Sequence, residues 1–100
     1  MAFKVIWTEK ALTDLSQILQ YWADRNKSNQ YSHKLSEIIL NRVELLSKYT
    51  GLGKKTNAKD IRAHLVKDYF LFYKTIEKTL IIISVFDTRL DPQKIKRSLK

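Results

Sequence analysis

The side chains best suited to chemistry in this sequence are cations placed on predicted strands. Arg62 and His64 are separated by one residue, so on a strand they share one face, about 7 Å apart. Arg89 follows the apolar run 80–86, a second predicted strand of the same sheet. An arginine held by a strand can grip a phosphate with two hydrogen bonds, and a nearby histidine can transfer a proton near neutral pH. The three side chains could converge on one surface, or they could simply be solvated cations on the open face of a basic sheet.

A second group of cations lies in the tail of the chain, after Pro92. Proline has no N–H to donate, so it stops strand pairing and leaves Lys94, Lys96 and Arg97 able to follow the surface of a partner. Together with Arg89, these side chains form a candidate target-binding surface. The competing interpretation is a solvated, frayed terminus.

The charge of the whole chain supports an anionic partner. Nineteen Lys and Arg against ten Asp and Glu give a net charge of +9. Seven basic and five acidic residues give +2 in residues 1–50, whereas twelve and five give +7 in residues 51–100. A positive field concentrated in one half of a protein favours phosphate backbones or an acidic protein partner.

Other kinds of site find little support in the sequence. The absence of cysteine excludes disulfides, thiolate metal sites and a cysteine nucleophile. His33 and His64 are too few and too far apart for a metal site, and the segment GLGKK lacks the spacing of a phosphate-binding loop. Asp87 and Asp91 are a weak candidate for a pair of acid–base carboxylates. We therefore expect neither a metal nor a cofactor.

Length and hydropathy indicate one compact domain that does not enter a membrane. One hundred residues with 44% hydrophobic side chains are enough for a single core, so residues 1–100 are predicted to form one domain. No run approaches the roughly 20 apolar residues of a membrane span, and residues 1–7 lack the regions of a signal peptide. We expect a soluble cytoplasmic protein with no membrane contact.

The first half of the chain has the pattern of two helices that follow a short strand. Phe3, Val5 and Trp7 alternate with other residues, as in a strand, and Thr8 can cap the helix that follows. Apolar residues then recur every three or four positions in two stripes: Ala11, Leu12, Leu15, Ile18, Leu19 and Trp22, then Tyr31, Leu35, Ile38, Ile39, Val43, Leu45, Leu46 and Tyr49. The polar link 25–29, with Ser28 as a possible cap, predicts an antiparallel helical hairpin, and Gly51 is placed as a helix C-terminal glycine.

The second half has the pattern of three strands after a basic loop. Residues 51–60 are polar and without periodicity, and alternation then begins at Ile61, with Arg62 and His64 on the face opposite Ala63 and Leu65. Two apolar runs, 69–73 and 80–86, are joined by short polar links, which predicts antiparallel neighbours in the centre of a sheet. The predicted fold is α+β with the order β-α-α-β-β-β, a two-helix antiparallel hairpin packed on a mainly antiparallel four-stranded sheet.

Three segments of the sequence together resemble the ParE/RelE superfamily of bacterial type II toxin–antitoxin systems. KVIWTEKALTDLSQILQYWADR is similar to the opening strand and first helix of ParE-type toxins. YSHKLSEIILNRVELLSKYTGLGKKT is similar to the second helix with its Gly-x-Gly exit, and IRAHLVKDYFLFYKTIEKTLIIISVFDTRLDPQK to the three closing strands. The long hairpin and the GLGKKT exit favour the ParE branch.

The resemblance implies a toxin held inactive by a cognate acidic antitoxin in a hetero-oligomer. ParE-like members inhibit DNA gyrase and need no nuclease site, whereas RelE-like members cut mRNA in the ribosome without a metal. For a RelE-like nuclease, the positions that match are Arg62, His64 and Arg89. An arginine of the next strand is replaced by Phe70, and a tyrosine beyond the last strand has no counterpart in residues 90–100.

The function favoured by the sequence is therefore a toxin that inhibits DNA gyrase by binding. One alternative is a ribosome-dependent mRNA endonuclease that uses Arg62, His64 and Arg89. A second alternative, from another class, is a non-toxic nucleic-acid-binding module that uses its basic face.

Overall fold

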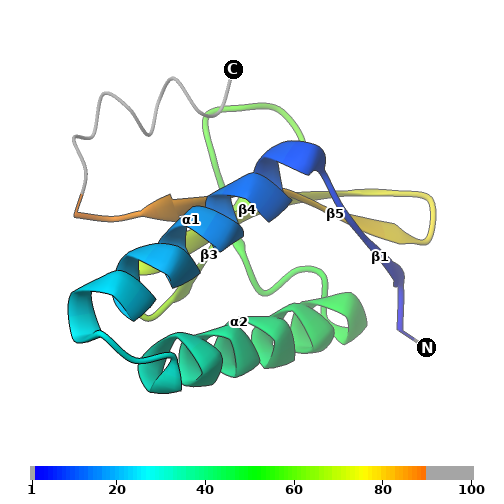
Figure 1. Cartoon of the computed structure of the whole chain (residues 1–100). Coiled ribbons are helices and arrows are strands. Elements are labelled where there is room, and N and C mark those ends of the chain that lie inside the picture. The colour runs from blue at the N-terminus through cyan, green and yellow to red at the C-terminus, as the bar shows by residue number, and fades with distance from the viewer. Residues whose placement is uncertain (1, 90–100) are drawn as a thin grey trace.

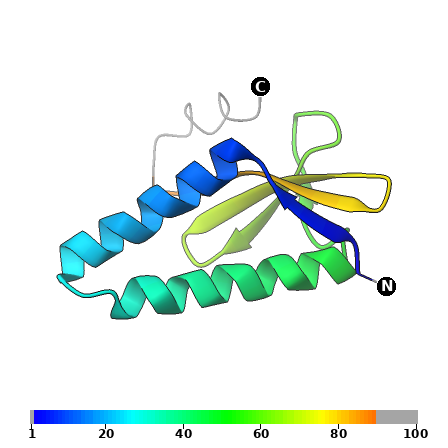
Figure 2. The same cartoon turned by 45° about the vertical axis from the view of Figure 1, so that its right-hand side comes forward.

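The computed structural model describes residues 2–89 and places two helices on one face of a five-stranded sheet (Figure 1). In chain order the elements are β1 (Lys4–Trp7), α1 (Glu9–Asn26), α2 (Gln30–Lys48), β2 (Lys54–Lys55), β3 (Arg62–Val66), β4 (Tyr69–Ile76) and β5 (Thr79–Asp87). The strands lie in the order β1-β5-β4-β3-β2, in which β1 pairs with β5 in parallel and all other neighbours are antiparallel. Figure 2 shows the two helices as an antiparallel hairpin.

The predicted α+β fold is confirmed, and the two apolar strands β4 and β5 lie inside the sheet as expected. The difference is β2, whose two residues were predicted to be part of a loop. Lys54 and Lys55 pair with Ala63 and Arg62, so the free edge of β3 creates this short strand. No alternation can be recognised in two residues, and this is why the predicted sheet has four strands.

Thr8 joins the sheet to the helical hairpin. Its Oγ1 accepts the N–H of Ala11 at 3.0 Å, which caps α1 as predicted. The same hydroxyl donates to the carbonyl of Ile83 at 2.8 Å, and the N–H of Thr8 donates to the carbonyl of Ile82 at 3.0 Å. One residue therefore ends the pairing of β1 with β5 and starts α1 against the edge of β5.

The link between the helices follows the prediction, with the cap displaced by one residue. Lys27 takes the left-handed conformation (φ 51°) that ends α1, and the N-cap position of α2 is Asn29, which makes no side-chain capping bond. The hydroxyl of Ser28 does accept the N–H of Gln30 at 3.2 Å. Ser28 thus satisfies one N–H of the first turn from outside the cap position.

The core lies between the helices and the sheet and is built mainly from the predicted stripes. Leu35, Ile39 and Leu46 of α2 are fully buried against Leu71 of β4 and Ile82 of β5.

Four residues of the predicted stripes are not core residues. Leu12, Tyr31, Leu45 and Tyr49 are 54%, 37%, 41% and 60% exposed. Each belongs to a broad apolar stripe, and only the middle of such a stripe faces the sheet. The prediction that these four side chains are buried is therefore wrong.

The glycine that the fold requires is Gly53 rather than Gly51. Helix α2 ends at Lys48, and no glycine has a positive φ, so Gly51 is not the left-handed C-terminal residue that was predicted. The fully buried phenol of Tyr73 accepts the N–H of Gly53 at 2.8 Å and donates to the carbonyl of Thr50 at 2.7 Å. A Cβ on Gly53 would lie 2.5 Å from this hydroxyl, so only glycine lets the loop approach Tyr73.

A bulge in β5 reverses the alternation of its side chains. Phe72 pairs with Ser84 and Tyr73 with Ile82, so Ile83 has no partner on β4. Before the bulge Ile82 faces the helices, and after it Val85 does, with Asp87 two residues further on opposite Tyr69. The bulge therefore turns the carboxylate of Asp87 to the side of the sheet that carries the helices.

The contact between Gly53 and Tyr73 predicts opposite outcomes for the two glycines. Gly53→Ala should lower the free energy of unfolding by about 1–3 kcal/mol, because the methyl group overpacks a buried phenol. Gly51→Ala is the matched control, because a Cβ there meets nothing within 4 Å, and it should change stability by less than about 0.5 kcal/mol. Urea denaturation of both proteins measures the difference. Equal stabilities would contradict the role given to Gly53.

Candidate functional site

Arg62 and His64 share one face of β3, as predicted, but this face is turned toward the helices. His64 lies opposite Leu71 and Arg62 opposite Tyr73, both of which are buried in the core beneath the helices. The other face of the strand carries Leu65, which is 51% exposed. The alternative interpretation, in which these residues are solvated cations on the open face of the sheet, is therefore wrong for Arg62 and His64.

His64 is tied to helix α2 by an arginine that the sequence did not single out. Nη1 of Arg42 lies 2.9 Å from Nε2 of His64 and 3.5 Å from the carbonyl of Leu65. Arg42 can only donate, so Nε2 accepts and the imidazole is neutral, with its proton on Nδ1. In the sequence, Arg42 lies beside the apolar stripe of α2. This position is equally typical of an ordinary solvated arginine, so it did not indicate the contact with His64.

The surroundings of His64 keep it neutral near pH 7. Burial lowers its pKa below the usual 6.5, the positive charge of Arg42 lowers the pKa further, and a backbone hydrogen bond at Leu52 opposes both effects. The nitrogen that would accept a proton from a substrate already accepts a hydrogen bond from Arg42. In this arrangement His64 connects α2 to β3.

Arg62 is also held by the protein. Its Nη1 donates to the carbonyl of Gly53 at 2.7 Å, next to the point at which Tyr73 holds the same loop. Arg62 therefore fixes the loop after α2 with part of its guanidinium group.

Arg89 lies at the other end of the sheet in a cluster of aromatic and charged groups. Its Nε donates to Oδ1 of Asp87 at 2.9 Å and its Nη2 to Oδ2 at 2.7 Å, so the pair is bidentate. The hydrogen bond from Arg89 lowers the pKa of Asp87 and raises the pKa of the arginine itself. The guanidinium lies over Trp22, 5.5 Å from the centre of the ring.

The ring of Trp22 is itself fixed by the sheet. Its Nε1 donates to the hydroxyl of Tyr69 at 2.7 Å, and Tyr21 and Tyr31 meet it edge to face. The guanidinium of Arg25 also lies near this indole, 5.7 Å from the centre of the ring. Trp22 was predicted only as a core residue, because its spacing on α1 is that of the apolar stripe.

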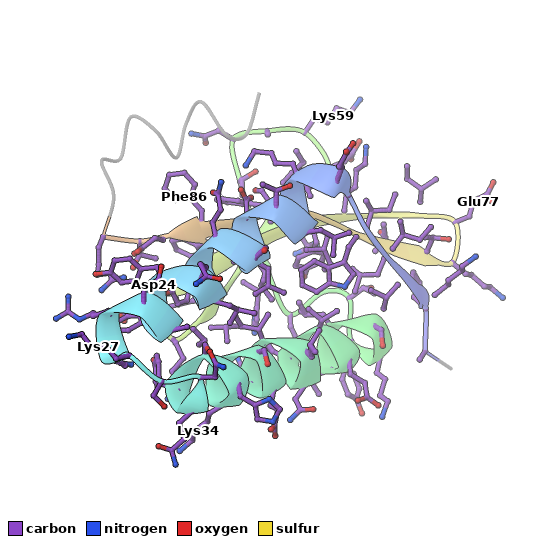
Figure 3. The ribbon with its side chains drawn as sticks, viewed as in Figure 1. Asp24, Lys27, Lys34, Lys59, Glu77 and Phe86 are labelled. Carbon is purple, nitrogen blue, oxygen red and sulfur yellow. The ribbon has the colours of Figure 1, made fainter. Side chains whose placement is uncertain are left out.

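An open hollow of about 500 Å³ adjoins this cluster, between α1 and the end of β5. We call it the Arg89 cleft; its lining includes Asp14, Ile18, Tyr21, Tyr69, Asp87 and Arg89. Apolar and aromatic walls with a few charged groups are typical of surfaces that bind another protein. Figure 3 labels Phe86, which also lines this cleft.

The structure does not bring Arg62, His64 and Arg89 together. Arg62 lies opposite Tyr73 and Asp87 opposite Tyr69, four positions apart on β4 or about 13 Å. They also belong to strands on opposite sides of β4. Lys94, Lys96 and Arg97, the other predicted target-binding residues, lie outside the described residues.

In residues 2–89, no three His, Asp or Glu side chains are grouped as metal ligands would be. Neither helix of this segment is long and apolar enough to cross a membrane.

The contact between Arg42 and His64 predicts a pH dependence of stability. The folded protein binds a proton at His64 less readily than the unfolded chain, so the free energy of unfolding should fall as the pH drops below about 6.5. The fall continues until the lowered pKa of the folded state is reached. His64→Gln cannot titrate and should lose less stability between pH 7 and pH 5. Thermal melts across this range measure both proteins, and parallel curves would contradict the assignment.

Comparison with known proteins gives the family. Residues 5–92 match the model of the family described as ParE toxin of type II toxin-antitoxin system, parDE. A solved structure described as the chromosomal ParDE TA system from P. aeruginosa is similar in fold, with a TM-score of 0.77 and 17% sequence identity over 88% of this chain and 98% of that chain. A search of curated proteins gave no match. The family model covers most of the sequence, and the chain therefore belongs to the ParE toxins of type II toxin–antitoxin systems.

Proposed function

We propose that this toxin acts by binding DNA gyrase and that Arg89 is central to the contact. The observation that carries the proposal is the separation of the cations. A nuclease needs its acid, its base and its phosphate-binding group around one scissile bond. Arg62 lies opposite Tyr73 on one side of β4, whereas Asp87, which binds Arg89, lies opposite Tyr69 on the other side, four positions away. A binding protein has no need to bring the two arginines together.

Arg89 has the properties expected of a binding residue. It follows a strand that the core holds in place, and its bond to Asp87 and contact with Trp22 restrict its conformations before a partner arrives. Side chains that are already ordered lose less entropy on binding. Nearly half of the side chain is exposed, so its outer surface is open to a target.

The alternative of a ribosome-dependent mRNA endonuclease receives less support. It would use Arg62 and His64, and both already make hydrogen bonds within the protein, to the carbonyl of Gly53 and to Arg42. The alternative of a non-toxic nucleic-acid-binding module is disfavoured by membership of a toxin family.

An acidic antitoxin is the partner that best fits the surface. The ParDE system from P. aeruginosa is described as a toxin–antitoxin system, and the net charge of +9 in this chain favours an acidic partner. Leu12, Leu40 and Leu45 are exposed on the helices, and such side chains can anchor the apolar part of a bound peptide. Binding to gyrase and to an antitoxin made in the same cell requires a cytoplasmic location.

The charge predicts how the antitoxin should associate. Its rate of association should fall as NaCl is raised from 50 to 500 mM, because salt screens the attraction between the basic toxin and an acidic partner. The rate of dissociation should change much less, because apolar contacts dominate it. Stopped-flow fluorescence of Trp22 and Trp7 can follow the reaction. An association rate that ignores ionic strength would argue against the electrostatic part of this proposal.

Arg89→Ala should abolish most of the toxicity while lowering the free energy of unfolding by less than about 1 kcal/mol, because the ion pair and the contact with Trp22 are near the surface. Arg25→Ala is the matched control, because it removes another arginine from the same ring. Growth arrest in cells and supercoiling by purified gyrase measure the effect. Wild-type toxicity of Arg89→Ala would rule out the role given to this residue.

Two measurements test which target the toxin acts on: the toxicity of the His64→Gln variant, and whether mRNA is cleaved in cells that make the wild-type protein. If gyrase is the target, the wild-type protein should inhibit supercoiling and leave mRNA intact, and His64→Gln should remain toxic because no proton transfer is needed. Cleaved mRNA together with a non-toxic His64→Gln protein that still folds would replace the gyrase proposal with the nuclease.

A further inference from the structure

We propose that a basic hollow at the end of the sheet far from Arg89 binds the phosphate backbone of a nucleic acid. The hollow has a volume of about 660 Å³ and lies between the loop after β2 and the end of β4. Its cations are Lys55, Lys59, Arg62 and Lys74, and we call it the Lys59 hollow. Figure 3 labels Lys59 on this loop, on the opposite side of the molecule from Lys34 of α2.

The charges of this hollow are largely uncompensated. Among residues 2–89, Asp60 is the one acidic residue in the lining, which has four cations. The ion pairs within the described part of the chain involve Lys10, His33, Lys48 and Arg89, none of which lines the hollow. Three ammonium groups are thus gathered around one concave surface without carboxylate partners, and an anionic ligand would stabilise this arrangement.

The loop that carries Lys59 is held in one conformation. Oγ1 of Thr56 donates to the carbonyl of Ile61 at 2.9 Å and accepts the N–H of Ala58 at 3.1 Å. The N–H of Ile61 donates back to the carbonyl of Ala58 at 3.2 Å, and Asp60 takes a left-handed conformation (φ 65°) to close the turn. The backbone of this loop therefore places its lysines before a ligand binds.

The lining favours a phosphate backbone over a peptide or exposed bases. Lysine is depleted in the centres of protein–protein interfaces, whereas lysine contacts with phosphates dominate binding to nucleic acids. No aromatic ring from the described part of the chain lines the hollow, so this lining offers no platform on which bases could stack. The hydroxyls of Thr56 and Thr75 are further donors suited to phosphate oxygens. Recognition should therefore be independent of sequence.

The Lys59 hollow is separate from the Arg89 cleft. Lys74 pairs with Ile81, whereas Asp87 pairs with Tyr69, five positions away on β4 or about 17 Å. A nucleic acid held by the hollow leaves the Arg89 cleft open to a protein. The inference does not depend on gyrase as the target and can fail independently of it.

The test uses the purified full-length chain without antitoxin, a fluorescent 20-base-pair DNA duplex and a 20-nucleotide single-stranded RNA. The variant Lys55→Gln/Lys59→Gln/Lys74→Gln keeps Arg62, which also holds the loop. This triple variant should bind the DNA and RNA probes at least about tenfold more weakly than the wild-type protein. The slope of the logarithm of the binding constant against the logarithm of the salt concentration should fall by about 2–3, because up to three phosphate contacts are lost. Anisotropy titrations at several salt concentrations measure both quantities.

The matched control is Lys27→Gln/Lys34→Gln/Lys48→Gln, which lowers the net charge equally with substitutions on the helical hairpin. It should keep nearly the wild-type slope. Equal losses in both triple variants would overturn the inference, because they would reflect net charge alone. The inference would also be overturned if the variant of the Lys59 hollow bound DNA and RNA normally and bound an acidic antitoxin poorly. A loss confined to one nucleic acid supports the inference and identifies the source of the phosphate.

Discussion

The edge of strand β5 is the constraint on which the rest of the structure depends. Strand β4 pairs with β5 over its whole length, whereas β1 covers only the first part of the other edge, up to Ile82. Beyond it, Thr8 binds the carbonyl of Ile83, and Oδ2 of Asp14 accepts the N–H of Val85 at 3.1 Å. Helix α1 therefore completes the edge that β1 leaves open. These bonds fix the helical hairpin on the sheet. They therefore also position the residues of α1 that follow Asp14, including Trp22.

The Arg89 cleft depends on this attachment together with the bulge in β5. Trp22 reaches Tyr69 because α1 is anchored along β5, and the bulge at Ile83 turns Asp87 to the same side. With strict alternation Asp87 would lie on the opposite face, and Arg89 would lose the carboxylate that holds it over the indole. The single extra residue of the bulge, Ile83, thus decides whether the basic end of β5 meets the aromatic end of α1.

Local pattern in the sequence was enough to predict every helix and strand except β2, as well as the cap at Thr8, because these depend on neighbours a few residues away. It could not predict which face of β3 meets the helices. Ala63 and Leu65 were the apolar side of that strand, yet Arg62 and His64 are the ones turned inward. Near the sheet edge, α2 covers the strand only in part, and a partner such as Arg42 can hold a polar face against a helix. Contacts of this kind join residues about 20 positions apart, for which a single sequence carries no signal.

The sheet also limits which chemistry this chain can perform. Hydrogen-bonded strands do not slide past one another, so the register fixes the separation along β4 between Arg62 and Asp87, the residue that holds Arg89. A nuclease that used both arginines around one bond would need them at other positions along the strands, without any change of fold. Binding makes no such demand, because separate cations can serve separate partners. The same architecture can in this way serve different functions.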